Sequence, residues 1–137
     1  MDITVQNLID AIRKNGLIKI QGNYYAFETN KDFGPVNVNY RYEVLDEDNI
    51  NEITSYPTPI GGCAYGQAAN NLGVEASDLD ARSRLTGITI DTGGEYRLVL
   101  NDYIRHLNDD TDMSLGEIAD KLEEVLTDEQ RFISFYV

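Results

Sequence analysis

The apolar residues of this sequence follow two different periods in turn, and this alternation limits the folds open to the chain. In residues 5–12 they recur every three or four positions, which predicts an amphipathic helix over 3–15 that ends at Gly16. Between 36 and 44 they alternate strictly with polar residues, as in a half-buried β-strand. A chain of 137 residues with both periods is expected to form one α+β domain, spanning 1–137.

The predicted strands form a small antiparallel sheet of three to five strands. Residues 17–21 and 24–29 favour strands, and Gly22-Asn23 between them suits the two-residue turn of a β-hairpin. Together with the strand at 36–44 they make a three-stranded antiparallel meander, the simplest assembly of these segments. Further short strands are expected at 50–56, 87–91 and 132–137.

About four helices are expected to pack with this sheet. Helices are predicted over 3–15, 61–72, 96–107 and 115–126, with one further turn around 77–81. Gly73 would end the second helix, and capping boxes at 92–95 and 114–117 would begin the last two. Because about six residues join those two helices, we expect them to form a C-terminal antiparallel helical hairpin.

The chain is strongly acidic, with 24 Asp and Glu against 11 Lys and Arg and a formal net charge of −13. Residues 101–129 alone carry ten acidic and two basic side chains. Binding to a phosphate backbone needs a set of Lys and Arg contacts, so no direct nucleic-acid binding is expected. Two interpretations of the acidic stretch remain open: a solvated face that keeps the protein soluble, or a surface that imitates nucleic-acid phosphates or binds a basic partner protein.

The nine tyrosines favour the second interpretation, because tyrosine-rich polar surfaces are typical of protein recognition. Ordinary packing on a half-buried sheet is the alternative for these side chains. If the acidic surface and the sheet bind a host protein with a basic surface, we expect the contacts to come from Asp109, Asp110, Asp112, Glu117, Asp120, Glu124, Tyr40 and Tyr42.

Two familiar patterns are present only in part. Residues 68–79 resemble the centre of a helix-turn-helix, but the acidic residues that follow the turn offset the nearby arginines, which disfavours DNA reading. Residues 108–112 resemble the opening of a calcium loop, but Met113 stands where a glycine is needed and Ala119 where a bidentate glutamate is needed. We therefore expect no metal and no cofactor.

The only cysteine, Cys63, excludes an internal disulfide and fits a reducing cytoplasm. No apolar run approaches the roughly 18 residues of a membrane span, so no membrane contact is expected. Cys63 at a helix start and the only histidine, His106, leave open a cysteine-dependent enzyme with a stabilised thiolate. Arg82, Arg84 and Arg97 leave open a small protein that sequesters nucleotide ligands.

Residues 63–68 (Cys-Ala-Tyr-Gly-Gln-Ala), Leu-Gly-Val at 72–74, Asn108-Asp109 and the helix that begins at Ser114 resemble an uncharacterised group of small proteins from actinobacteria and their phages. The likeness covers residues 61–126. The resemblance implies an accessory protein encoded by a phage or another mobile element, and it brings no catalytic residue with it. We therefore expect a non-enzymatic protein-interaction module, such as an inhibitor of a host protein, with no assignable oligomeric state.

Charge repulsion within the acidic stretch leads to one expectation about stability. Asp120 and Glu124 lie four residues apart on one helical face, where like charges are destabilising. Repulsion between such exposed, unpaired carboxylates raises their folded pKa values. The melting temperature should then rise with added salt, and as the pH falls from 7 toward about 5.

Overall fold

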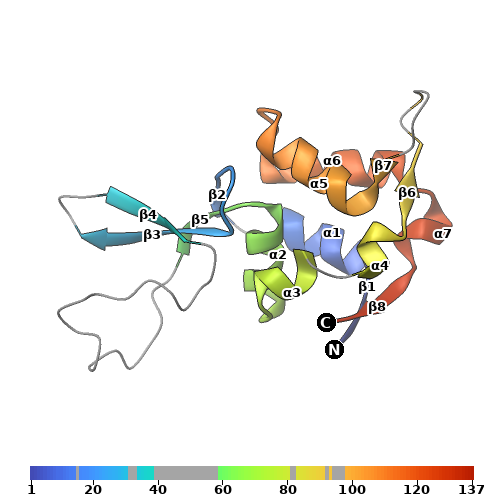
Figure 1. Cartoon of the computed structure of the whole chain (residues 1–137), viewed down its shortest axis with the longest axis horizontal. Helices are drawn as coiled ribbons and strands as arrows, with labels where there is room; N and C mark the ends of the chain where they lie inside the picture. Colours follow the sequence, from blue (N-terminus) through green and yellow to red (C-terminus); the bar gives the residue numbers. More distant parts are fainter. Residues whose placement is uncertain (15, 31–33, 39–58, 81–82, 92, 94–97) are drawn as a thin grey trace.

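The computed structural model describes residues 1–14, 16–30, 34–38, 59–80, 83–91, 93 and 98–137. These residues combine helices and strands, which confirms the α+β class (Figure 1). The helices are α1 (Val5–Arg13), α2 (Ala64–Leu72), α3 (Ala76–Asp80), α4 (Ser83–Thr86), α5 (Leu100–Asp109), α6 (Leu115–Val125) and α7 (Asp128–Arg131). The strands are β1 (Asp2–Thr4), β2 (Ile18–Lys19), β3 (Tyr25–Asn30), β4 (Gly34–Val38), β5 (Pro59–Gly62), β6 (Thr89–Ile90), β7 (Leu98–Val99) and β8 (Ser134–Tyr136).

Helix α1 lies at the centre of the helical part of the molecule, in contact with α6 and α2 (Figure 1). Its predicted apolar stripe is confirmed, because Val5, Leu8, Ile9 and Ile12 are all completely buried. Burying one such aliphatic side chain contributes about 1.5–3 kcal/mol. This single helix therefore supplies a large share of the core on which the other helices pack.

Both ends of α1 differ from the prediction. The helix begins at Val5 because Thr4 caps it, with Thr4 Oγ1 accepting from Asn7 N at 3.1 Å, and the residues before it form strand β1. Gly16 does not adopt the left-handed conformation expected of a helix stop. The helix ends instead at an extended Lys14, and the side chain of Asn71 on α2 donates hydrogen bonds to the carbonyl oxygens of Ala11 and Lys14.

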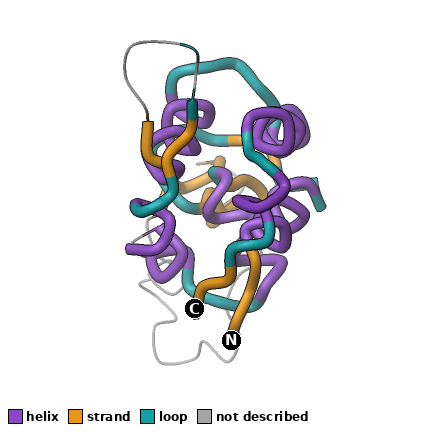
Figure 2. Tube along the Cα trace, turned by 90° about the vertical axis from the view of Figure 1, so that its right-hand side faces the viewer, coloured by secondary structure: helices purple, strands orange, loops and turns teal. Residues whose placement is uncertain are grey.

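The predicted terminal strand is confirmed as β8, and it pairs antiparallel with β1 in the register Asp2↔Tyr136. Both ends of the chain therefore lie side by side (Figure 2). The terminal ammonium group also donates to the Val137 carbonyl oxygen at 2.8 Å. This two-stranded sheet of β1 and β8 is separate from the main sheet.

The main sheet has the order β2-β5-β3-β4 and is mixed, because β2 runs parallel to β5 while β3 is antiparallel to both of its neighbours. The predicted antiparallel hairpin of 17–21 with 24–29 is therefore wrong, and so is the three-stranded meander. Strand β5 lies between the two segments. The predicted strand at 36–44 is described only as far as Val38, as part of β4, and the one at 50–56 lies outside the described residues.

Two glycines explain how β5 fits between β2 and β3. A Cβ on Gly61 would come within 3.0 Å of the Ile18 carbonyl oxygen, and one on Gly62 within 3.2 Å of the Tyr24 carbonyl oxygen. Glycine removes these contacts, and the backbone of each flanking segment can then reach β5. Both glycines were expected in a helix over 61–72, whereas they end strand β5 and α2 starts only at Ala64.

The remaining helices agree with the prediction in part. Gly73 ends α2 with φ +73°, and Ser114 and Glu117 form the predicted capping box of α6. Helix α5 begins at Leu100, later than predicted, because residues 98–99 pair with β6 and Leu100 N donates to the Ile88 carbonyl oxygen at 2.7 Å. Helices α5 and α6 are in contact, but α6 packs mainly on α1.

Candidate functional site

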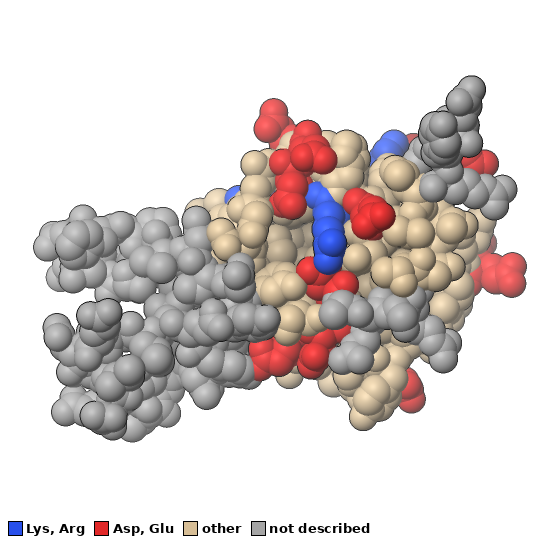
Figure 3. All heavy atoms as spheres, in the orientation of Figure 1, with Lys and Arg blue, Asp and Glu red and all other residues tan. Residues whose placement is uncertain are grey.

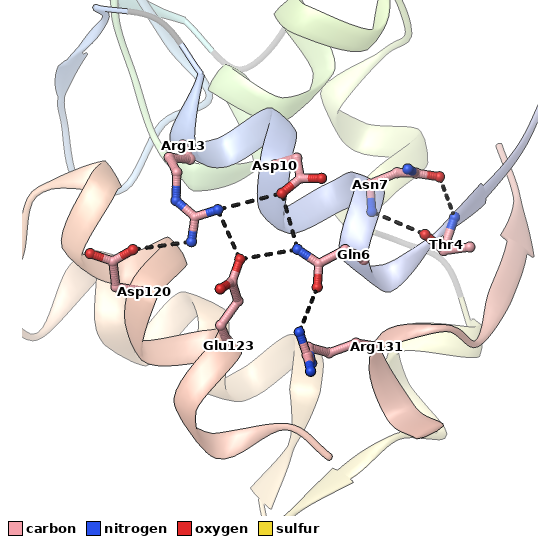
Figure 4. Close-up of polar contacts among 8 residues, drawn as sticks. All are labelled: Thr4, Gln6, Asn7, Asp10, Arg13, Asp120, Glu123 and Arg131. Atoms are coloured by element: carbon pink, nitrogen blue, oxygen red, sulfur yellow. Dashed lines mark hydrogen bonds and ion pairs between the residues drawn. The ribbon is translucent and has the colours of Figure 1, made fainter. Parts of the chain in front are cut away.

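The acidic residues of α6 are engaged by other groups of the same chain. Arg13 of α1 reaches across to α6 and contacts Asp120 at 3.0 Å and Glu123 at 2.8 Å (Figure 4). Gln6 joins the network by donating to Glu123 at 3.0 Å. The hydrogen bond and charge of Arg13 lower the pKa of Glu123 below its usual range. These carboxylates help to fix α6 on α1.

Two further acidic residues of α6 have local roles. The Glu117 carboxylate accepts from Ser114 N at 3.1 Å, and this hydrogen bond lowers the pKa of Glu117. Glu124 forms an ion pair with Lys121 at 3.5 Å. The assumption that the acidic residues of α6 are unpaired is therefore wrong for Glu117, Asp120 and Glu124. The expected rise in stability on acidification loses its basis there.

The acidic residues at the end of α5 and in the loop after it are in a different situation. Asp110 contacts His106 at 3.0 Å, and both side chains are more than half exposed. Asp112 is exposed and has no Lys or Arg partner among the described residues. The structure thus divides the predicted partner site into engaged carboxylates on α6 and exposed ones at 110–112. Tyr40 and Tyr42 lie outside the described residues.

A pocket of about 330 Å³ lies beside this exposed acidic segment. Residues 22–24 form one wall, residues 63–65 at the start of α2 another, and the second half of α5 a third. Asp80 at the end of α3 completes the lining. On the face shown in Figure 3, a basic group lies between acidic groups above and below it. The pocket is therefore built where four segments far apart in the sequence meet.

Asp80 is the centre of the hydrogen-bond network in this pocket. Its Oδ1 accepts from Arg105 Nε at 2.9 Å and Nη2 at 2.7 Å, and its Oδ2 accepts from the Tyr24 hydroxyl at 2.8 Å. The Asn101 amide satisfies its neighbours when its nitrogen faces them, donating to the Tyr65 hydroxyl and, at 3.2 Å, to Asp80. Burial raises the pKa of both tyrosines, so both hydroxyls are protonated at neutral pH.

Asp109 and Asn108 connect the pocket wall to the rest of the fold. Asp109 Oδ1 accepts from Gly22 N at 3.1 Å and from the Asn108 amide at 2.9 Å. The side-chain oxygen of Asn108, Oδ1, accepts from Ala64 N at 2.9 Å, and its side-chain nitrogen also donates to the Ile20 carbonyl oxygen. The partial calcium-loop pattern at 108–112 therefore has a structural use, because its first side chain is buried and holds two other segments in place. Groups of three or more His, Cys, Asp or Glu side chains arranged for a metal do not occur among the described residues.

Cys63 lines the pocket but does not have the stabilised thiolate that its place at a helix start suggested. It is the N-cap of α2, and its sulfur accepts from Gly66 N at 3.4 Å. Burial opposes this effect and is larger, raising the pKa of the thiol to about 11. His106, the proposed base, is not among the residues that line the pocket. Of the arginines considered for nucleotide binding, Arg82 and Arg97 lie outside the described residues.

Four residues of the pocket were not predicted from the sequence as site residues: Tyr24, Tyr65, Asp80 and Arg105. Asp80 and Arg105 are 25 positions apart and belong to different helices, so no local spacing connects them. The residues that resemble a helix-turn-helix form a corner between α2 and α3, in which Ala76 and Leu79 are buried. That corner is what brings Asp80 to the pocket.

Comparisons of this chain with protein-family models, with curated proteins and with solved structures find no match. Among the described residues, no helix has both the length and the apolar character needed to cross a membrane.

Proposed function

We propose that this protein is a non-enzymatic interaction module that binds a basic surface of a partner protein. The exposed carboxylates of Asp110 and Asp112 next to the pocket carry this proposal. Acidic residues without a cationic partner favour association with a basic surface, because the attraction accelerates encounter and disfavours partners of like charge. The paired carboxylates of α6 contribute less, since a partner would have to compete with Arg13 and Lys121 for them.

The proposal includes the context implied by the resemblance to actinobacterial and phage proteins. In that context the partner is a host protein that this chain inhibits, and both proteins meet in a reducing cytoplasm. A free, buried Cys63 is compatible with such a compartment. An enzyme that uses Cys63 is a weaker candidate, because its thiol is protonated at neutral pH and His106 does not line the pocket.

A pull-down with two matched variants tests the proposal. The variant Asp110→Lys/Asp112→Lys reverses the charge at the exposed segment, and Glu124→Lys/Glu129→Lys makes the same change in net charge on α6 and α7. Lysates of an actinobacterial host supply the candidate partners, and the captured protein is then purified for direct titration. We expect a captured partner to bind wild type and the α6/α7 variant alike and to lose affinity for the first variant. Equal affinity for both variants would refute a docking surface at 110–112.

A further inference from the structure

The pocket next to the exposed acidic segment has the properties of a site for one cationic side chain. Its ionisable lining consists of two carboxylates, Asp80 and Asp109, and one guanidinium, that of Arg105. The Cys63 thiol and both tyrosine hydroxyls are uncharged at neutral pH, so the lining has a net negative charge. An anionic ligand is therefore disfavoured and a cationic one favoured.

The start of α2 does not offset this preference. A helix N-terminus can bind anions through its free N–H groups. Here Ala64 N already donates to Asn108 at 2.9 Å and Gly66 N to the Cys63 sulfur at 3.4 Å. A phosphate or carboxylate would have to displace these partners and approach two carboxylates. The pocket is therefore unsuited to the nucleotide ligands considered from the sequence.

One carboxylate oxygen remains for a ligand. Asp80 uses both oxygens, for Arg105 and for Tyr24. Asp109 accepts both of its hydrogen bonds from described residues through Oδ1 and none through Oδ2. A single oxygen suits the three-donor ammonium of lysine better than a guanidinium, which pairs best with two acceptors in a fork.

The walls suit the rest of a lysine side chain. Ile104 provides apolar contact for an alkyl stem, and Tyr24 and Tyr65 line the same space. Aromatic rings attract ammonium groups placed over their faces. A volume of about 330 Å³ accommodates one long side chain and lies at the lower end of the range of small-molecule pockets.

We infer that this pocket binds a lysine side chain of the partner protein, with Asp109 as the carboxylate that receives its ammonium group. The inference rests on the proposed function, because it takes the same acidic face as the docking surface. It adds the anchor that would set the position of the partner. Interfaces of this kind depend on a few side chains inserted into pockets.

NMR titration of the isotopically labelled protein tests the inference directly. The probe is a capped Gly/Ser peptide with one central lysine, and its control is the same peptide with Nε-acetyl-lysine. We expect the lysine peptide to shift the backbone amide signals of Gly22, Ala64 and Arg105 in a saturable manner. Acetylation removes the charge, and the control peptide should leave these signals in place. Equal shifts with both peptides would overturn the inference.

Two variants locate the carboxylate responsible. Asp109→Asn keeps an oxygen for Gly22 N and Asn108 but removes the charge, and we expect it to weaken lysine-peptide binding about tenfold, the loss of one charge-assisted hydrogen bond. Asp110→Asn makes the same charge change outside the pocket and should alter binding less than about twofold. Equal effects of both variants would refute the role of Asp109. A free polyamine, putrescine, is titrated in the same way. If putrescine shifts the same signals at a tenth of the peptide concentration, the assignment of the pocket to a protein side chain is overturned.

This experiment separates the inference from the proposed function. If partner capture depends on 110–112 but the pocket does not respond to the lysine peptide, the lysine site is refuted and the docking surface stands. If the lysine peptide binds in the pocket but charge reversal at 110–112 does not change partner capture, the docking surface is refuted and the pocket remains a cation site.

Discussion

Replacing Gly66 by alanine is expected to disrupt the junction that forms the pocket. Gly66 lies in the first turn of α2, against the backbone of Tyr24. A Cβ there would be 1.9 Å from the Tyr24 carbonyl oxygen and 2.8 Å from its carbonyl carbon. Ordinary contacts of a Cβ begin near 3.4 Å, so one backbone segment must retreat by about 1.5 Å.

Three contributions determine how much this retreat lowers the free energy of unfolding. The Tyr24 carbonyl accepts a hydrogen bond from Cys63 N at 3.1 Å, and its loss in a buried site costs about 1–3 kcal/mol. Overpacking adds about 1–3 kcal/mol, whereas the higher helix propensity of alanine returns about 1 kcal/mol. We expect a net destabilisation of about 3 kcal/mol, which corresponds to a melting temperature lower by roughly 10 °C.

Urea unfolding followed by circular dichroism measures this loss, and Gly116→Ala is the matched control. Gly116 also lies in the first turn of a helix, but the nearest atom to its Cβ would be Ser114 Oγ at 4.0 Å. The control should be neutral or more stable by up to about 1 kcal/mol. A Gly66→Ala protein within about 1 kcal/mol of wild type would show that the close contact with Tyr24 does not constrain the fold.

Two further predictions concern the cap of α2 and the contact of α1 with α6. Cys63→Ser keeps an acceptor for the helix cap, whereas Cys63→Ala removes it. The serine variant should therefore be more stable than the alanine variant by about 1 kcal/mol in urea unfolding. Equal stabilities of the two variants would argue against a capping role for Cys63. Because Arg13 lowers the folded pKa of Glu123, the ion pair stabilises above the unfolded pKa near 4.5, and this contribution is lost as the pH falls through the lower folded value. The melting temperature should therefore stay level between pH 8 and about 5.5 and fall below about pH 4.5. The fall should be less steep for the variant Glu123→Gln, and a melting temperature that rises on acidification would contradict this prediction.

Features of the fold that depend on neighbours in the sequence could be predicted. The stripe on α1 follows from a helical period, and the capping box of α6 from Ser114 and Glu117 three residues apart. The order of the sheet could not be predicted in this way. Gly61 and Gly62 resemble a flexible helix start, and only the approach of Ile18 and Tyr24 from either side shows why a side chain is excluded. The pattern of residues within a short stretch of sequence does not predict such contacts between distant segments.

The pocket was missed for a related reason. Asp80 appeared in the sequence only as one of several acids after a helical turn, and Arg105 as one of two bases in an acidic stretch. Their ion pair depends on how the fold brings the end of α3 within reach of Arg105 on α5. Cys63 shows that a correct position can still give the wrong chemistry. The sequence placed it at a helix start, but burial, which depends on the surrounding fold, raises the pKa of its thiol more than the cap lowers it.

The acidic stretch shows how folding gives different roles to residues of equal charge. Composition makes the ten acids of 101–129 equivalent, and it therefore predicted uniform repulsion. The structure separates them according to which element each one faces. Asp120 and Glu123 on α6 face α1, whose last turn presents Arg13, and their ion pairs link the two helices. The carboxylates after the end of α5 face solvent beside a pocket whose own cation is already paired with Asp80. Asp110 contacts His106, and Asp112 has no Lys or Arg partner among the described residues. Under the proposed function, these two exposed carboxylates are the ones that would meet a basic partner.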